Sequence, residues 1–165
     1  FIRSLWFLIE DPLFGNPKIK TVMYAKGHYY LYKKKNPFKH LIYPLPNSNG
    51  HGIHAGMDIE NNLRFGPNAK WVDSIEYSFD ENTLEEFCNS IKSYWINFDP
   101  LCLTPDYTGI RSKIVAEGEG SQDFEILDAS DHGLENLVHL QGIDSPGLTS
   151  SLSIAAEVIN KLGIH

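Results

Sequence analysis

The chain has 165 residues, enough to bury a sizeable core, and its 42% hydrophobic and 21% charged residues are ordinary for a soluble globular protein. A formal net charge of -7 argues against nucleic acid as a partner. No apolar run reaches the roughly 18 residues of a membrane span, and the hydrophobic start lacks a signal-peptide pattern. Two cysteines, Cys88 and Cys102, provide neither a disulfide framework nor a metal-ligand spacing. We therefore expect a cytoplasmic protein without a transmembrane segment.

The first part of the chain predicts strands and a hairpin. Residues 21–32 are rich in aromatic and β-branched side chains, which is typical of a strand. Leu41-Ile42-Tyr43 predicts a second strand, and the two prolines that follow it closely end this strand. Segments 52–56 and 63–66 flank an acidic, Asn-rich stretch at 58–62, whose residues tolerate the left-handed conformations of a tight turn. These two segments are therefore predicted to pair as a hairpin.

The middle of the chain predicts one helix, over residues 82–95. Its apolar residues recur at steps of three and four and form one stripe, which is typical of core packing. The stripe consists of Leu84, Phe87, Cys88, Ile91, Tyr94 and Trp95. Asn82 with Glu85 three residues later predicts a capping arrangement at the start. Residues 97–122 are interrupted by prolines and glycines and predict a loop, and a short strand is predicted at 124–127.

The last segment predicts a strand, a glycine turn and a helix. Residues 137–141 predict a buried strand that ends at Gly142. Ser145 is the predicted helix N-cap, Pro146 the first helical position, and Gly163 the glycine after the helix. The helical apolar stripe is Leu148, Leu152, Ala155, Ile159 and Leu162. From the residues alone, the elements predict an α/β or α+β domain.

The glycine turn before the terminal helix is the first candidate binding feature. A helix start presents unpaired backbone N–H groups and a partial positive charge, which suit a phosphate, a carboxylate or a carbonyl oxygen that gains charge. The same turn also occurs for packing alone. A self-sufficient dinucleotide binder needs a G-x-G-x-x-G loop between a strand and a helix. The nearest match, residues 50–56, has the wrong spacing and no helical pattern after it.

Histidine and arginine side chains supply the other candidates. His51 and His54 could begin a metal site, but no third ligand follows at a typical spacing. His54 is also a candidate proton acceptor, because neutral imidazole suits that role near neutral pH, and a purely structural histidine is equally open. Arg111, in the predicted loop, has a guanidinium fork that can bind a carboxylate bidentately, with a solvated surface arginine as the alternative.

Six short motifs follow one another along the chain. They are Ala25-Lys26-Gly27-His28-Tyr29-Tyr30, Leu41-Ile42-Tyr43-Pro44-Leu45-Pro46, Gly52-Ile53-His54, Arg64-Phe65-Gly66-Pro67-Asn68, Pro105-Asp106-Tyr107-Thr108-Gly109-Ile110-Arg111 and Gly142-Ile143-Asp144-Ser145-Pro146-Gly147-Leu148-Thr149. In this order they resemble the later half of the L-2-hydroxyglutarate dehydrogenase/oxidase group, within the D-amino-acid-oxidase-like FAD-dependent oxidoreductases. The resemblance implies an α+β fold with a mixed, largely antiparallel β-sheet. Residues 1–130 would form part of a substrate-binding domain, and residues 131–165 a strand–helix piece of an FAD-binding domain.

The resemblance also implies a function and a set of site residues. The complete enzyme would use FAD to oxidise a small 2-hydroxy acid such as L-2-hydroxyglutarate. Arg111 and Tyr43 would bind the substrate, and His54 would take the proton of its hydroxyl group. The residues implied at the flavin are Gly142, Ser145, Gly147, Leu148 and Thr149.

The chain departs from the family pattern at several points. Asp144 stands where Glu is usual and Ser112 where Pro is usual, and the amino-terminal glycine fingerprint is absent. Because the chain also begins with Phe1 rather than Met, we expect a fragment or split subunit that retains little FAD alone and is inactive alone. A separate chain carrying the amino-terminal FAD-binding half is then the expected partner. The alternatives are a non-catalytic remnant or small-acid-binding module, and a metal-dependent hydrolase that uses His51 and His54.

Overall fold

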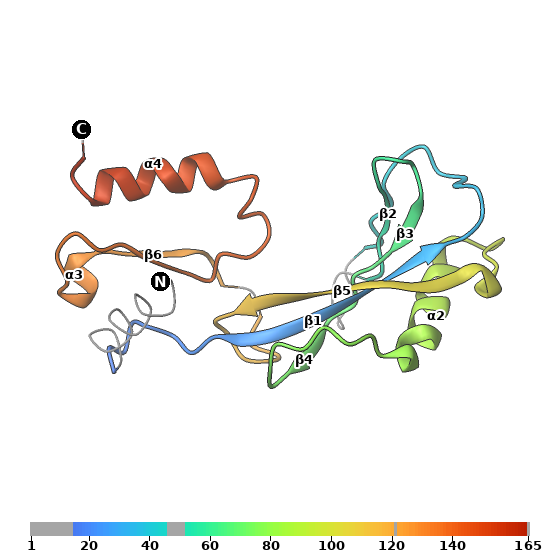
Figure 1. The fold of residues 1–165 in the computed structure, drawn as a ribbon, viewed down its shortest axis with the longest axis horizontal. Helices are drawn as coiled ribbons and strands as arrows, with labels where there is room; N and C mark the ends of the chain where they lie inside the picture. Colours follow the sequence, from blue (N-terminus) through green and yellow to red (C-terminus); the bar gives the residue numbers. More distant parts are fainter. Residues whose placement is uncertain (1–14, 46–51, 121, 165) are drawn as a thin grey trace. The chain divides into compact units, whose positions relative to one another are not determined.

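The computed structural model describes residues 15–45, 52–120 and 122–164 (Figure 1). The chain divides into two compact units. Tyr24–Arg111 form one, here called the sheet unit, and Ser112–His165 with Phe1–Met23 form the other, here called the terminal unit. Helices and antiparallel strands occur in both, which confirms the predicted α+β class. Among the described residues, no helix has the length and apolar character needed to cross a membrane.

The sheet unit is built around one long strand. Its strands are β1 (Met23–Tyr32), β2 (Ala55–Met57), β3 (Leu63–Phe65), β4 (Lys70–Val72) and β5 (Leu103–Lys113). β3 and β4 both pair antiparallel with β1, with Tyr30 opposite Phe65 and Ala25 opposite Trp71. These registers are nearly continuous, so β3 and β4 run along the same edge of β1. β5 also pairs with β1 and therefore occupies the other edge (Figure 1).

The predicted hairpin is confirmed. β2 and β3 pair antiparallel, and the Asp58 carboxylate in the turn accepts backbone N–H groups two and four residues later, at 2.9 and 2.8 Å. Asn61 adopts the expected left-handed conformation, with φ of 65°. The strand predicted at 41–43 is wrong. It is reduced to one isolated bridge between Ile42 and Ala55, because the prolines that follow have no N–H to continue a ladder.

The loop predicted over residues 97–122 is also wrong, because β5 occupies eleven of these residues. Pro105 and Gly109 suggested a loop, but both are tolerated in a strand at the edge of a sheet, where one row of backbone groups needs no partner. Within the described part of the chain, β5 pairs only with β1. Pro105 and Gly109 therefore indicated the low intrinsic strand propensity of this segment, but not its pairing with β1.

The predicted helix forms and packs as expected. α2 (Leu84–Tyr94) follows the short 3-10 helix η1 (Glu81–Thr83), and a second one, η2 (Pro100–Cys102), precedes β5. The predicted cap by Asn82 and Glu85 is wrong, because the Asp80 carboxylate accepts the Asn82 N–H at 3.0 Å. Phe87 and Ile91 are fully buried, and burial of each side chain contributes roughly 1.5–3 kcal/mol.

The core of the sheet unit lies between α2 and one face of the sheet. Its buried members are Tyr30, Tyr32, Ile53, Ala55, Leu63, Phe65, Phe87, Ile91, Phe98 and Leu103. Cys88 packs against this core, as predicted from its place on the apolar stripe. Many of the contacts are between aromatic rings in edge-to-face arrangements, such as those of Tyr32 with Phe65 and Trp95. The alternate residues of β1 thus supply one wall of the core.

His28 is a buried titratable group in this core. Its backbone N–H donates to Asn68 Oδ1 at 2.9 Å and its ring Nδ1 lies 3.0 Å from the same oxygen, whereas Nε2 has no hydrogen-bond partner among the described residues. Nδ1 therefore carries the proton of the neutral ring. Burial is the main cause that holds the pKa of His28 below its usual value of 6.5.

We expect the free energy of unfolding to fall as the pH drops below 6.5, because the unfolded chain then protonates His28 while the folded chain keeps it neutral. The contribution is fully present above 6.5 and is lost as the pH falls toward the lower folded-state pKa. Thermal unfolding at about pH 7.5 and about pH 5.5 measures this loss, and the His28→Gln variant should show a smaller one. An equal pH dependence in the two proteins would contradict this role.

The terminal unit contains a short antiparallel pair and two helices. Its elements are β6 (Glu125–Leu127), α3 (Ala129–His132), β7 (His139–Gln141) and α4 (Ser151–Lys161). β6 and β7 pair antiparallel and confirm the two predicted strands, although β7 is shorter than predicted and only Gln141 in it is buried. Lys20 joins this pair through its N–H to Gln141 Oε1 at 3.0 Å and its Nζ to Glu125 Oε1 at 2.5 Å. Lys161 at the end of α4 forms an ion pair with Asp128 at 2.7 Å.

The predicted terminal helix is confirmed, but its predicted start is wrong. α4 begins at Ser151, and residues 145–150 form turns. Pro146 lies in these turns and not at the first helical position, and the Gly147 N–H donates to the Asp144 carbonyl in a tight turn. Gly163 has φ of 66° immediately after the end of the helix, as predicted.

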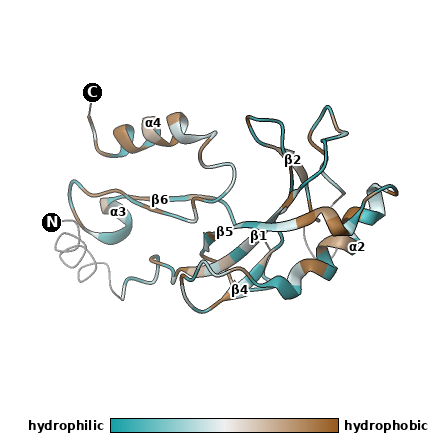
Figure 2. Cartoon of the chain, turned by 45° about the vertical axis from the view of Figure 1, so that its right-hand side comes forward, coloured by the Kyte–Doolittle hydropathy of each residue, from teal (hydrophilic) through white to brown (hydrophobic). Residues whose placement is uncertain are grey.

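The apolar side of α4 is uncovered within the described residues. No residue of the helix is buried, and Leu152 is 85% and Ile159 50% exposed. Leu148, in the turn before it, is 92% exposed. Figure 2 shows brown, apolar segments along α4. The stripe predicted from the sequence is therefore present, but it does not pack in a core formed by the described residues.

Candidate functional site

The face of the sheet opposite α2 carries the candidate site. His28 and Tyr30 pack toward the helix side, so the alternation of β1 directs Tyr29 and Leu31 to the opposite face. Residues directly paired in an antiparallel sheet share a face, and Arg64 is paired with Leu31. Arg64 therefore lies on the same side as Tyr29. We call this side the Tyr29 face.

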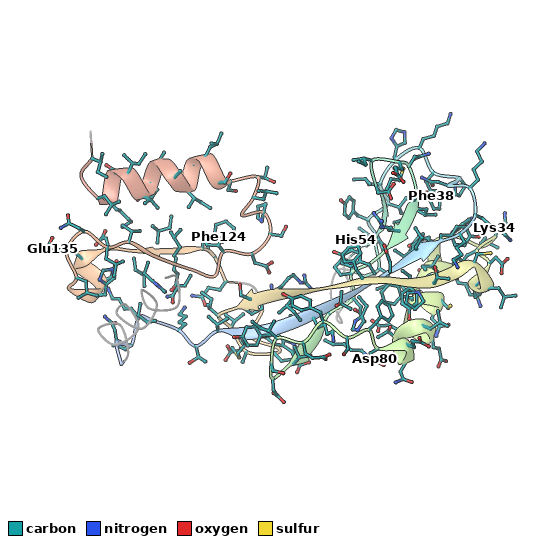
Figure 3. The ribbon with its side chains drawn as sticks, in the orientation of Figure 1. Lys34, Phe38, His54, Asp80, Phe124 and Glu135 are labelled. Carbon is teal, nitrogen blue, oxygen red and sulfur yellow. The ribbon has the colours of Figure 1, made fainter. Side chains whose placement is uncertain are left out.

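Two predicted site residues, His54 and Tyr43, come together on this face. Gly56 is paired with Arg64, and His54, two residues earlier, continues the same side of the strand. The Gly66 N–H donates to the His54 carbonyl at 3.0 Å, which extends the pairing of the hairpin to this residue. The rings of Tyr43 and His54 are T-shaped, with centroids 4.4 Å apart. Figure 3 shows His54 beside the hairpin.

The backbone next to His54 is fixed from the helix side. The Ile53 side chain is 3% exposed, its carbonyl accepts the Tyr94 hydroxyl at 3.0 Å, and its N–H donates to Ser90 Oγ at 3.4 Å. Burial raises the pKa of Tyr94, which keeps this hydroxyl a donor. α2 therefore determines the position of the His54 backbone although it lies across the sheet.

Arg111 lies in β5 and not in a loop. No Asp or Glu among the described residues forms an ion pair with it, whereas Arg64 contacts Asp106 at 2.6 Å and Asp58 at 3.2 Å. Burial raises the pKa of Tyr29, and the Arg111 guanidinium opposes part of this rise. Arg111 is therefore near Tyr29, and its half-exposed guanidinium is available to an anion.

A stacked tyrosine pair beside Arg111 was missed as part of the site. The rings of Tyr29 and Tyr107 stack with centroids 4.4 Å apart and an interplanar angle of 15°. Alternation within residues 21–32 was a usable signal for Tyr29, because every second residue of a half-buried strand leaves the core. Tyr107 had no such signal, since its segment was predicted to be a loop.

In the terminal unit, two of the predicted cofactor residues are glycines that tolerate no side chain. Gly142 has φ of 70°, and a Cβ there would lie 2.5 Å from Ile114 Cδ1. A Cβ on Gly147 would lie 2.7 Å from the Asp144 carbonyl oxygen. Both glycines are therefore required by the local backbone, whatever else they contact.

The same turn leaves polar donors free. The backbone N–H groups of Leu148 and Thr149 have no acceptor within the described parts of the chain, and both residues are exposed, as is Ser145. Two adjacent N–H groups and a hydroxyl form a donor set that fits carbonyl or phosphate oxygens of a bound group. The residues predicted at the flavin are thus chemically suited to it.

The alternative metal site finds no support in the residues that the structure covers. They include no group of three or more His, Cys, Asp or Glu side chains able to hold a metal ion, and His51 lies outside the described residues. A surface depression of about 500 Å³ lies over α2, lined by residues that include Glu81, Leu84 and Cys88. Its lining contains none of the predicted site residues.

Comparison with known proteins gives matches along most of the chain. Residues 6–161 match the family described as DAO, FAD dependent oxidoreductase. The mitochondrial L-2-hydroxyglutarate dehydrogenase of Arabidopsis thaliana is 35% identical, over 84% of this chain and 31% of that protein. The glycerol 3-phosphate oxidase of Mycoplasma genitalium is 28% identical, over 84% of this chain and 36% of that protein. The chain thus spans about a third of the length of each of these relatives.

The fold also matches a solved structure. Dithionite-reduced L-alpha-glycerophosphate oxidase from Mycoplasma pneumoniae with FAD bound is similar with a TM-score of 0.70. The match covers 88% of this chain and 38% of that one, at 18% sequence identity, and so establishes the fold. With the family match over residues 6–161, the predicted resemblance is confirmed, and the chain belongs to the DAO family of FAD-dependent oxidoreductases.

Proposed function

We propose that this chain is the carboxyl-terminal part, or a split subunit, of an FAD-dependent oxidoreductase that oxidises a small 2-hydroxy acid such as L-2-hydroxyglutarate. The observation that carries the substrate class is the guanidinium of Arg111. It lacks an acidic partner among the described residues, on the sheet that also carries His54 and Tyr43. A substrate carboxylate would supply the missing anion through a bidentate pair.

The residues of the sheet unit then have distinct roles. Arg111 binds the carboxylate of the substrate, and the Tyr43 ring holds the His54 imidazole through their edge-to-face contact. His54 accepts the hydroxyl proton of the substrate, the work of a general base. FAD, when bound, supplies the oxidising power by accepting hydride from the carbon that carries the hydroxyl group.

The terminal unit is proposed to contact FAD. Gly142, Ser145, Gly147, Leu148 and Thr149 line the turn before α4, where the free N–H groups can donate to flavin oxygens. The sequence predicted a domain boundary between residues 130 and 131, whereas the compact units separate between Arg111 and Ser112. We therefore assign the sheet unit to substrate binding and the terminal unit to the FAD-binding domain.

A second candidate substrate is glycerol 3-phosphate. Relatives named glycerol 3-phosphate dehydrogenase, from Caloramator mitchellensis, and glycerol 3-phosphate oxidase, from Mycoplasma genitalium, are 29% and 28% identical to this chain. The fork of Arg111 can bind a phosphate as well as a carboxylate. Both candidates are small anionic alcohols, so the same residue roles apply.

Reconstitution tests the proposal directly. Co-expression with a chain that carries the amino-terminal dinucleotide-binding half is expected to give a yellow, flavin-loaded complex. The chain alone should stay colourless, because it has no glycine-rich cradle for the phosphates. Absorbance spectra of both preparations measure this difference. A flavin tightly bound to the chain alone would contradict the expectation that FAD binding requires the amino-terminal half.

Anaerobic mixing of the yellow complex with substrates then separates the candidate functions. Bleaching by L-2-hydroxyglutarate and not by glycerol 3-phosphate supports the proposal, and the reverse selectivity supports the second candidate. A flavin-loaded complex that neither compound bleaches would favour a non-catalytic binding module.

A further inference from the structure

We infer that Arg64 is a positioning residue that ties β5 to the β2–β3 hairpin and so holds Arg111 in place for the substrate. The inference rests on the proposed function, in which Arg111 binds the substrate anion. Arg64 lies on the Tyr29 face, but its own charge is already compensated. Its role therefore follows from the groups that it joins.

The contacts of Arg64 cross the central strand. Its Nε donates to Asp106 Oδ2 on β5 at 2.6 Å, and its Nη1 lies 3.2 Å from Asp58 Oδ2 in the hairpin turn. β3 and β5 pair with opposite edges of β1, so the bond to Asp106 spans β1. Asp58 is itself fixed by Asn62, whose backbone N–H and side-chain amide donate to it at 2.8 and 2.9 Å.

Arg64 also contacts the ring that follows Asp106. Its guanidinium carbon lies 5.9 Å from the centroid of the Tyr107 ring, within cation–π range, and Tyr107 stacks on Tyr29. Asp106, Tyr107 and Arg111 belong to the same strand, β5. Fixing the first two therefore restrains the path of the backbone that carries the third.

β5 needs such a restraint because its backbone is weakly held. Among the described residues it pairs with β1 alone, and it contains Pro105, which has no N–H to donate, and Gly109, which is conformationally free. The contact between the Arg64 and Asp106 side chains supplies an additional fixed point for β5 on the Tyr29 face.

The charges exclude a simpler reading in which Arg64 binds the substrate. One guanidinium stands against the two carboxylates of Asp58 and Asp106, so the cluster carries a net charge of -1. Hydrogen bonds are the first cause that lowers the pKa of Asp58 and raises the pKa of Arg64, which keeps these two groups ionised at neutral pH. A substrate anion is repelled there and is directed to Arg111.

The test uses the reconstituted flavoprotein with Arg64→Gln, Asp106→Asn and the double variant. Lys34→Gln is the matched control, because it breaks an exposed ion pair of 2.6 Å, with Asp99, that does not involve the Tyr29 face. Hydrogen exchange of peptides covering 103–113 measures the tie, and steady-state kinetics with the 2-hydroxy acid measure its consequence. Peptides covering α2 report on global destabilisation.

We expect Arg64→Gln to accelerate exchange in 103–113 but not in α2, and to raise KM about tenfold or more while kcat stays within about threefold. Because Arg64 acts through Asp106, the double variant should raise KM no more than Arg64→Gln does alone. Arg64→Lys keeps the charge but not the planar fork, so its KM should lie between that of Arg64→Gln and that of the unmodified protein. Lys34→Gln should behave like the unmodified protein.

Unchanged exchange in 103–113, or additive effects of the two substitutions on KM, would overturn the inference. Failure of the proposed function has a different signature. In that case the unmodified complex does not turn over 2-hydroxy acids at all, and exchange in 103–113 alone decides whether Arg64 ties β5. Accelerated exchange with an unchanged KM in an active enzyme would show that the tie does not position Arg111.

Discussion

His54→Gln in the flavin-loaded enzyme is expected to lower kcat by about 10²–10⁴-fold, the usual range for loss of a general base. Glutamine keeps a polar side chain of similar reach but cannot accept a proton at neutral pH. The edge-to-face contact with Tyr43 would be lost as well, so a small loss of local order accompanies the chemical effect. Stopped-flow flavin bleaching under saturating 2-hydroxy acid measures the chemical step.

His40→Gln is the control for this experiment, because His40 is exposed and is not one of the proposed site residues. It should leave the rate of flavin bleaching unchanged. A second variant, His54→Ala, leaves space for an added base, so free imidazole should restore part of the lost rate. If imidazole has no effect and His54→Gln retains full kcat, the role of proton acceptor belongs to another group.

Arg111→Gln is expected to weaken substrate binding by roughly 10–100-fold, because a hydrogen-bonded pair with a charged group contributes roughly 1.5–3 kcal/mol. Arg111→Lys should lose less, since the positive charge remains but the planar fork does not. The same change should not alter the affinity of the complex for FAD. Titration with the corresponding 2-oxo acid, followed by the perturbation of the flavin spectrum, gives the dissociation constant without turnover.

Lys92→Gln serves as the matched control for the loss of one positive charge, because Lys92 is exposed on α2, on the other side of the sheet. It should bind the 2-oxo acid like the unmodified protein. If both substitutions weaken binding equally, the effect is one of overall charge and Arg111 does not contact the substrate.

Residue patterns predicted β1, the hairpin and α2, because each has a strong local signal. β1 has clustered aromatic residues, the hairpin has an Asn- and Asp-rich turn, and α2 has an apolar stripe at helical spacing. β5 was predicted to be a loop because its stability comes from pairing with β1, about 80 residues earlier, and no local window contains that information. The start of α4 failed for a local reason instead: a turn in which the Gly147 N–H donates to the Asp144 carbonyl replaced the predicted cap and first helical position.

The candidate site was also predicted only in part from the sequence. Chemistry in a single residue was readable, so His54 and Arg111 were selected as a base and an anion binder. The distinction between two arginines on one face was not readable. It depends on the ion pairs of Arg64 with Asp106 and Asp58, and on the lack of such a pair between Arg111 and any described acidic residue. Charge compensation is a property of the assembled sheet.

The exposure of α4 bears on how this helix can vary in evolution. Within the described residues, none of its side chains is fully buried, although Ile154 and Val158 are half-buried. Packing against the described residues therefore constrains the exposed Leu152 and the half-exposed Ile159 far less than it constrains Phe87. Any purifying selection that keeps these positions apolar must act through contacts with groups other than the described residues. Such selection would appear as apolar residues retained at these positions in an alignment of close relatives.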